Sequence, residues 1–178
     1  MEVAAAFLAW LGVSVVVVSD GRWGLALGTA IATVGLAALA FPSSGILGTS
    51  ALAIGGVASA GRRATTGPPG WGIMPAGSTP RVVLCVAVAL AALWTALSLT
   101  FGGDAALRFA VFAVVGLAVA RVLSNDQVPG VLSAVALMPL AVAAATGFGV
   151  QAGGLVYIAA AAIAAAVPWL PLRKPVAA

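Results

Sequence analysis

The sequence predicts an all-α protein, a single transmembrane bundle of about seven helices that takes up residues 1–178. Two observations on composition support this: 63% of the residues are hydrophobic and 7% are charged, with a mean hydropathy of +1.20, whereas soluble domains carry about 25% charged residues. Apolar runs also recur along the chain between Gly, Pro, Ser and charged residues, and their length is close to the ~20 residues that a membrane helix needs. Lipid is therefore the expected solvent.

The elements follow in order along the chain. The first run, within MEVAAAFLAWLGVSVVVVSD, lacks the cationic start of a secretory signal, and we expect it to remain as the first span. The third run, GILGTSALAIGGVASA, is the weakest, because at 1.5 Å per residue it covers only about 24 Å of a ~30 Å hydrocarbon core. The seven predicted spans are about 3–18, 23–41, 45–60, 82–101, 105–123, 128–146 and 150–170, with one long cytoplasmic loop at 61–81.

The positions of the cations predict the orientation of these spans, since short loops rich in Lys and Arg stay in the cytoplasm. With the N-terminus outside, Arg108 is the only cation on the outer side. If the third run fails to cross, six spans remain and Arg22 falls on the wrong side. The favoured topology therefore has the C-terminus in the cytoplasm, within the plasma membrane of a bacterium or archaeon, and its cytoplasmic cations are Arg22, Arg62, Arg63, Arg81, Arg121, Arg173 and Lys174.

The loop GRRATTGPPGWGIMPAGSTPR gathers Arg62, Arg63 and Arg81 around Trp71. Cations at this level gain about 1 kcal/mol each beside anionic lipid headgroups. The loop's TTGPPGWGIMP segment is apolar for a solvated connection, and two alternatives stay open: it folds back onto the helix ends, or it contacts a partner protein. Arg121, near the inner end of its span, is expected to extend to the headgroups.

Small residues and one proline mark predicted packing sites. Gly24, Gly28 and Gly35 lie roughly along one stripe of the second span, which favours close helix packing, either within the chain or with a partner chain. Pro139, near the centre of the sixth span, removes a backbone donor and predicts a bend in that helix. Broken helices of this kind also line transport routes.

The residue inventory argues against several kinds of chemistry. Histidine is absent and Cys85 is the only cysteine, so no metal site and no cofactor are expected. The spans carry no carboxylate near their centres and no lysine, which leaves proton-coupled transport and a Schiff base unsupported. The scattered cations predict topology and give no indication of nucleic-acid binding.

One motif resembles that of an enzyme family. FGGDAALR, with Asp104, resembles the Gly-x-Gly-Asp element of membrane aspartyl prepilin peptidases, and the resemblance implies that Asp20 supplies the second carboxylate of a catalytic dyad. Phe101 stands where the family has the first glycine, and the family's Ile-Pro-Asn context is missing. The predicted topology also places the two carboxylates on opposite membrane faces.

These observations favour a small non-enzymatic membrane protein, an accessory or scaffolding subunit of a larger membrane complex. Its expected partners are the lipid bilayer and another membrane protein. The alternative is a facilitative transporter of a neutral or apolar solute, with Pro139 and the hydroxyl groups of the spans lining its route. The peptidase is the least favoured hypothesis.

Overall fold

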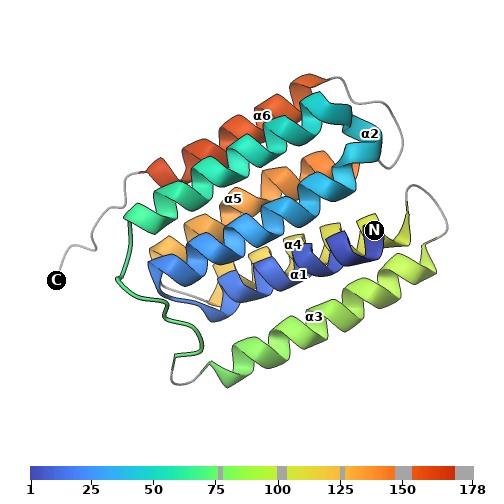
Figure 1. Ribbon diagram of the computed structural model, residues 1–178. Coiled ribbons are helices and arrows are strands. Elements are labelled where there is room, and N and C mark those ends of the chain that lie inside the picture. The colour runs from blue at the N-terminus through green and yellow to red at the C-terminus, as the bar shows by residue number, and fades with distance from the viewer. Residues whose placement is uncertain (76–77, 100–103, 125–126, 147–153, 171–178) are drawn as a thin grey trace.

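The computed structural model describes residues 1–178 except 76–77, 100–103, 125–126, 147–153 and 171–178. Within the described segments the chain forms a bundle of six α-helices followed by a short 3-10 turn (Figure 1). The prediction of an all-α fold is therefore confirmed. The elements are α1 (Glu2–Val18), α2 (Arg22–Thr65), α3 (Thr79–Ser98), α4 (Ala105–Ser124), α5 (Val128–Ala145), α6 (Gly154–Ala166) and η2 (Val167–Trp169).

Helix α2 is folded back on itself. Gly45 has φ 62° and ψ −166°, a non-helical conformation that joins two helical halves, and Figure 1 shows these halves side by side. Gly56 of the second half lies so close to Thr33 of the first that a Cβ atom at Gly56 would overlap the Thr33 side chain. The turn that the sequence predicts at FPSSG, just before the third run, is where the chain reverses.

The second half of α2 is longer than predicted. It continues past Ala60 to Thr65, so that its length from Ile46 is about 30 Å at 1.5 Å per residue. The helix therefore extends beyond the predicted span at 45–60 and takes in residues 61–65 of the predicted loop, because Arg and Ala favour helix and the first proline after Gly45 is Pro68. The connection to α3 is correspondingly short, residues 66–78.

Four helices, α2, α3, α4 and α5, are long and apolar enough to cross a membrane, and α1 and the Gly154–Trp169 segment are shorter apolar helices. Helices α1, α2, α4, α5 and α6 form most of one apolar core, to which α3 contributes Cys85. Helix α3 lies at the edge of the bundle and packs mainly against α4 (Figure 1).

Glycines allow α1 and α2 to approach closely. A Cβ atom at Gly35 would lie 2.6 Å from the carbonyl oxygen of Ala5, and one at Gly28 would lie 2.7 Å from that of Gly12. Two of the three glycines on the predicted stripe therefore face α1. Gly24 instead faces the connection 66–78, where a Cβ atom would lie 2.6 Å from the Trp71 carbonyl oxygen.

Pro139 lies inside α5, which is continuous from Val128 to Ala145. Because proline has no backbone N–H, it leaves the carbonyl of the preceding turn without its usual helical donor. The bend at Pro139 stays a prediction.

Candidate functional site at the arginine-rich end of the bundle

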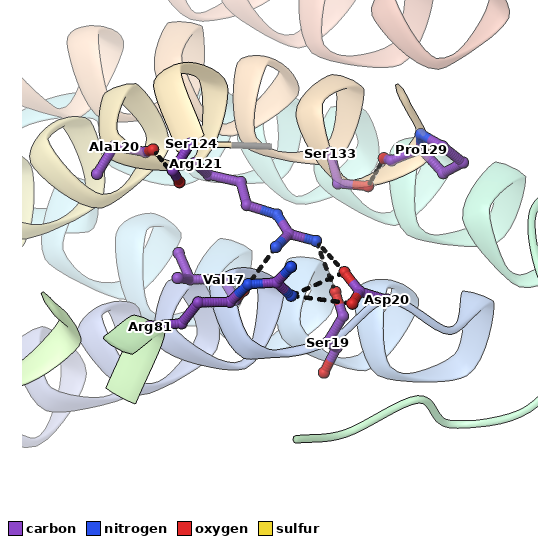
Figure 2. Close-up of polar contacts among 9 residues, drawn as sticks. All are labelled: Val17, Ser19, Asp20, Arg81, Ala120, Arg121, Ser124, Pro129 and Ser133. Atoms are coloured by element: carbon purple, nitrogen blue, oxygen red, sulfur yellow. Dashed lines mark hydrogen bonds and ion pairs between the residues drawn. The ribbon is translucent and has the colours of Figure 1, made fainter. Parts of the chain in front are cut away.

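A buried ion pair joins two distant parts of the chain. Asp20 lies in the short connection between α1 and α2, and Arg121 lies in the last turn of α4. Arg121 Nη2 is 2.6 Å from Asp20 Oδ1 (Figure 2), and the side chain of Arg121 is 1% exposed. The same guanidinium donates to the carbonyls of Val17 and Ser19, each at 2.9 Å, and so caps the end of α1.

Arg81 completes this network from a third element. It lies near the start of α3, and its Nη1 is 3.0 Å from Oδ1 and 2.9 Å from Oδ2 of Asp20 (Figure 2). One carboxylate therefore holds together the α1–α2 connection, α3 and α4. We refer to Asp20, Arg81 and Arg121 as the Asp20 network.

The network fixes the charge of Asp20. Burial raises the pKa of this carboxyl group, but the hydrogen bonds from Arg121 and Arg81 outweigh that effect, and the net pKa lies below its ordinary value of 3.8. Asp20 is therefore ionised at neutral pH and serves as a counter-ion.

The expectation that Arg121 extends to the headgroups was wrong. The side chain turns into the protein because hydrogen-bond acceptors, the carbonyls at the end of α1 and the Asp20 carboxylate, lie there. Gly130 of α5 also leaves space for the guanidinium. A Cβ atom at Gly130 would lie 2.5 Å from Arg121 Nη2. The sequence offered one signal, because Asp20 is an acid near a predicted span end on the same side of the membrane as Arg121.

Residues 66–75 of the connection fold back onto the turn between α1 and α2, so the backbone of this segment packs within the chain. Asp20 N donates to Gly72 O at 3.0 Å, and Met74 N donates to Val18 O at 3.1 Å. Its apolar side chains remain available at the surface: Trp71 is 55% exposed, with its ring centroid 6.5 Å from that of Trp23. A partner contact through Trp71 stays a prediction.

Arg62 and Arg63 lie in the last turn of α2, beside the C-terminal end of the described chain. The guanidinium of Arg62 stacks 4.2 Å from the ring centroid of Trp169, whereas Arg63 is only 2% exposed. Both line a cleft of about 330 Å³, which we call the Arg63 cleft. Its lining residues are Arg62, Arg63, Thr66, Gly67, Pro129, Pro168, Trp169 and Leu170.

The structure does not bring together the two carboxylates of the peptidase resemblance. Asp104 immediately precedes α4, whereas the Arg121 that binds Asp20 lies near the other end of that helix. Asp104 and Arg121 are 17 positions apart, which corresponds to about 25 Å of helix. Asp20 and Asp104 therefore cannot share a proton, and Phe101 lies outside the described residues.

Three of the buried hydroxyl groups of the helices donate within their own helices. Thr29 donates to Leu25 O and Thr33 donates to Thr29 O, each at 2.7 Å, while Ser133 donates to Pro129 O at 2.9 Å. Each bond returns to the preceding turn. These three donors satisfy helical carbonyls and do not point to a solute route.

No protein-family model matches this chain, and neither the curated proteins nor the solved structures contain a match.

Proposed function

We propose that the chain is an integral protein of a bacterial or archaeal plasma membrane, with seven spans, the N-terminus outside and the C-terminus in the cytoplasm. The two halves of α2 and the five other α-helices provide seven helical segments. Arg22, Arg62, Arg63, Arg81 and Arg121 belong to the end of the bundle that holds the connection 66–78, and Arg108 contacts Leu99 at the other end. This separation follows the rule that cations stay inside.

Within that membrane, we propose that the protein is a non-enzymatic accessory or scaffolding subunit of a larger complex. The observation that carries this proposal is the position of α3. Of its 20 residues, those buried are Cys85, Ala92 and Ala96, whereas α4, of equal length, buries eight. The exposed side chains of α3 include Val83, Val86, Leu90, Leu93, Trp94 and Leu97.

Grooves on both sides of α3 suit a neighbouring membrane helix. One groove of about 320 Å³ runs between α3, α1 and α4 and is lined by residues such as Phe7, Leu97 and Phe109. Another, of about 230 Å³, lies beside Trp94 and Phe112. Because lipid gives helices no hydrophobic reason to associate, membrane interfaces depend on this kind of van der Waals fit. The partner is therefore expected to cover α3.

The chemistry of the bundle interior supports a structural role. Asp20 is bound by the buried Arg121 and by the partly exposed Arg81. The buried hydroxyls of Thr29 and Thr33 donate to their own helix. These contacts stabilise the fold.

Site-directed crosslinking in native membranes tests the subunit proposal. The chain has a single cysteine, so a Cys85→Ala background accepts one new cysteine at Leu90 of α3. A matched control is a cysteine at Ile163 of α6, since Leu90 is 63% and Ile163 54% exposed. A photoactivated thiol-linked probe at Leu90 should give one protein adduct of defined mass, and at Ile163 it should give lipid adducts.

Two outcomes would count against a subunit. The first is lipid adducts alone at Leu90 as well as at Ile163. The second is recovery of a stable, partner-free chain after mild detergent extraction, with no difference in stability between Leu90→Trp and Ile163→Trp. Solute flux through vesicles that contain this chain alone, altered by Pro139→Ala, would instead favour the facilitative transporter.

A further inference from the structure

We propose that the Arg63 cleft binds a phosphate group, and that the phosphate belongs either to an anionic phospholipid or to a soluble phosphate compound. The inference concerns one end of this chain and does not depend on a protein partner. Its starting point is Arg63, whose Nε and Nη2 atoms are buried and have no hydrogen-bond partner among the described residues.

A buried guanidinium with open donors is costly unless an anion compensates it. Burying an ion without a counter-charge costs far more than burying a satisfied polar group. Arg62 increases the cost, because it is the neighbouring residue and its positive charge acts on Arg63. Two cations beside one cleft of about 330 Å³ therefore create a strong local preference for an anion.

The described carboxylates do not supply that anion. Asp20 is bound by Arg81 and Arg121. Glu2 begins α1 and Asp104 precedes α4, both at the other end of the bundle from the Arg63 cleft. Among the described residues no carboxylate is left to pair with Arg63, and we therefore infer that an external anion supplies the counter-charge.

The walls of the cleft indicate what kind of anion fits. Guanidinium groups present parallel N–H donors that match phosphate oxygens. Trp169 holds Arg62 in place through a cation–π contact at 4.2 Å, and the proline and leucine side chains around the cleft (Pro129, Pro168 and Leu170) provide an apolar wall. A volume near the lower end of the usual range for ligand pockets, about 300–1,000 Å³, suits a headgroup or a small phosphoester.

The experiment uses the full chain, purified in detergent and stripped of lipid, with thermal unfolding as the readout. The probes are inorganic phosphate, phosphatidylglycerol added to the micelles, and diacylglycerol as the phosphate-free lipid. If a lipid occupies the cleft, phosphatidylglycerol should raise the melting temperature at concentrations at least tenfold below those of inorganic phosphate. If a soluble compound does, inorganic phosphate should act and phosphatidylglycerol should not.

Variants decide whether the effect belongs to the cleft. Arg63→Gln should weaken the ligand-induced stabilisation at least about tenfold in ligand concentration, and Arg63→Lys should weaken it less. Arg62→Gln is the second variant, because Arg62 is partly exposed and its loss disturbs the fold less. The matched control is Arg22→Gln, at the same end, where the guanidinium lies 5.5 Å from the Trp23 ring centroid and outside the cleft lining.

Three results would overturn the proposal. Equal losses in Arg22→Gln and Arg63→Gln would indicate general attraction to a basic surface. Equal effects of diacylglycerol and phosphatidylglycerol on the melting temperature would show that the cleft does not recognise the phosphate group. Asp126 lies between α4 and α5 in the sequence, outside the described residues. Binding that emerges only in Asp126→Asn would mean that this carboxylate of the chain itself fills the cleft.

Discussion

Asp20 Oδ1 lies 2.6 Å from Arg121 Nη2, although the two residues are 101 positions apart in the sequence. The pair joins the turn after α1 to the end of α4, and Arg81 extends it to α3. Because Arg121 is 1% exposed, its charge depends on this one carboxylate for compensation. The pair therefore specifies how three elements meet at the arginine-rich end.

Asp20→Asn should destabilise the protein strongly, because it removes the counter-charge and leaves Arg121 buried. Breaking a buried pair from one side costs about 3–5 kcal/mol. Cys85 is 4% exposed and is the chain's single cysteine, so its labelling by a thiol-reactive dye on heating reports unfolding. The control is Asp104→Asn, an exposed position where the same change should cost less than about 0.5 kcal/mol. Similar losses in the two variants would contradict a special role for the Asp20 network.

Acid should weaken the protein through the same carboxylate. The folded-state pKa of Asp20 is below the unfolded value near 3.8, so the folded state favours the ionised form. The stabilisation is complete above the unfolded pKa and is lost as the pH falls from about 3.8 through the lowered folded pKa. Melting temperatures measured from pH 7 to pH 2 should decline in that acid window, and the decline should be smaller in Asp20→Asn. An identical slope in the two proteins would exclude Asp20 as its source.

The helices could be predicted because their signals are local. The apolar runs have the length that a bilayer requires, and the turn at FPSSG, with Gly45 at its end, shows in the sequence itself. The helix continues past the predicted end of the third run, because Arg62 and Arg63 are good helix formers, and the pattern of apolar residues does not show this.

The Asp20 network could not be predicted in the same way. The orientation of Arg121 depends on the carbonyls of Val17 and Ser19 and on the space beside Gly130, none of which is near it in sequence. The Arg63 cleft likewise needs Trp169 beside Arg62, a contact across more than 100 positions. Sequence spacing predicted that these arginines share a membrane face, and it carried no information on which of them are buried.

Glycine substitutions should separate close packing from helix propensity. Gly35→Ala places a Cβ atom 2.6 Å from the Ala5 carbonyl oxygen, so α1 must shift, and the expected cost is about 1–3 kcal/mol. Gly61→Ala meets nothing within 4 Å and should stabilise the helix by about 0.5–1 kcal/mol. The same thermal assay measures both. A neutral Gly35→Ala would show that α1 and α2 do not approach as closely as in the structure.

Cysteine accessibility in intact cells should reveal the topology. In the Cys85→Ala background, the three test positions are Ser43, Gly61 and Asp104, all of which are exposed. Ser43 precedes the reversal at Gly45, so if both halves of α2 cross the membrane, it lies on the outer face together with Asp104. A membrane-impermeant maleimide should then label Ser43→Cys and Asp104→Cys in intact cells, and Gly61→Cys only after permeabilisation. Labelling of Gly61→Cys in intact cells would show that the orientation is the reverse of the proposed one. Ser43→Cys could instead be labelled only after permeabilisation while Asp104→Cys is labelled in intact cells. That result would show that α2 folds back without crossing the membrane, so the chain would have fewer than seven spans.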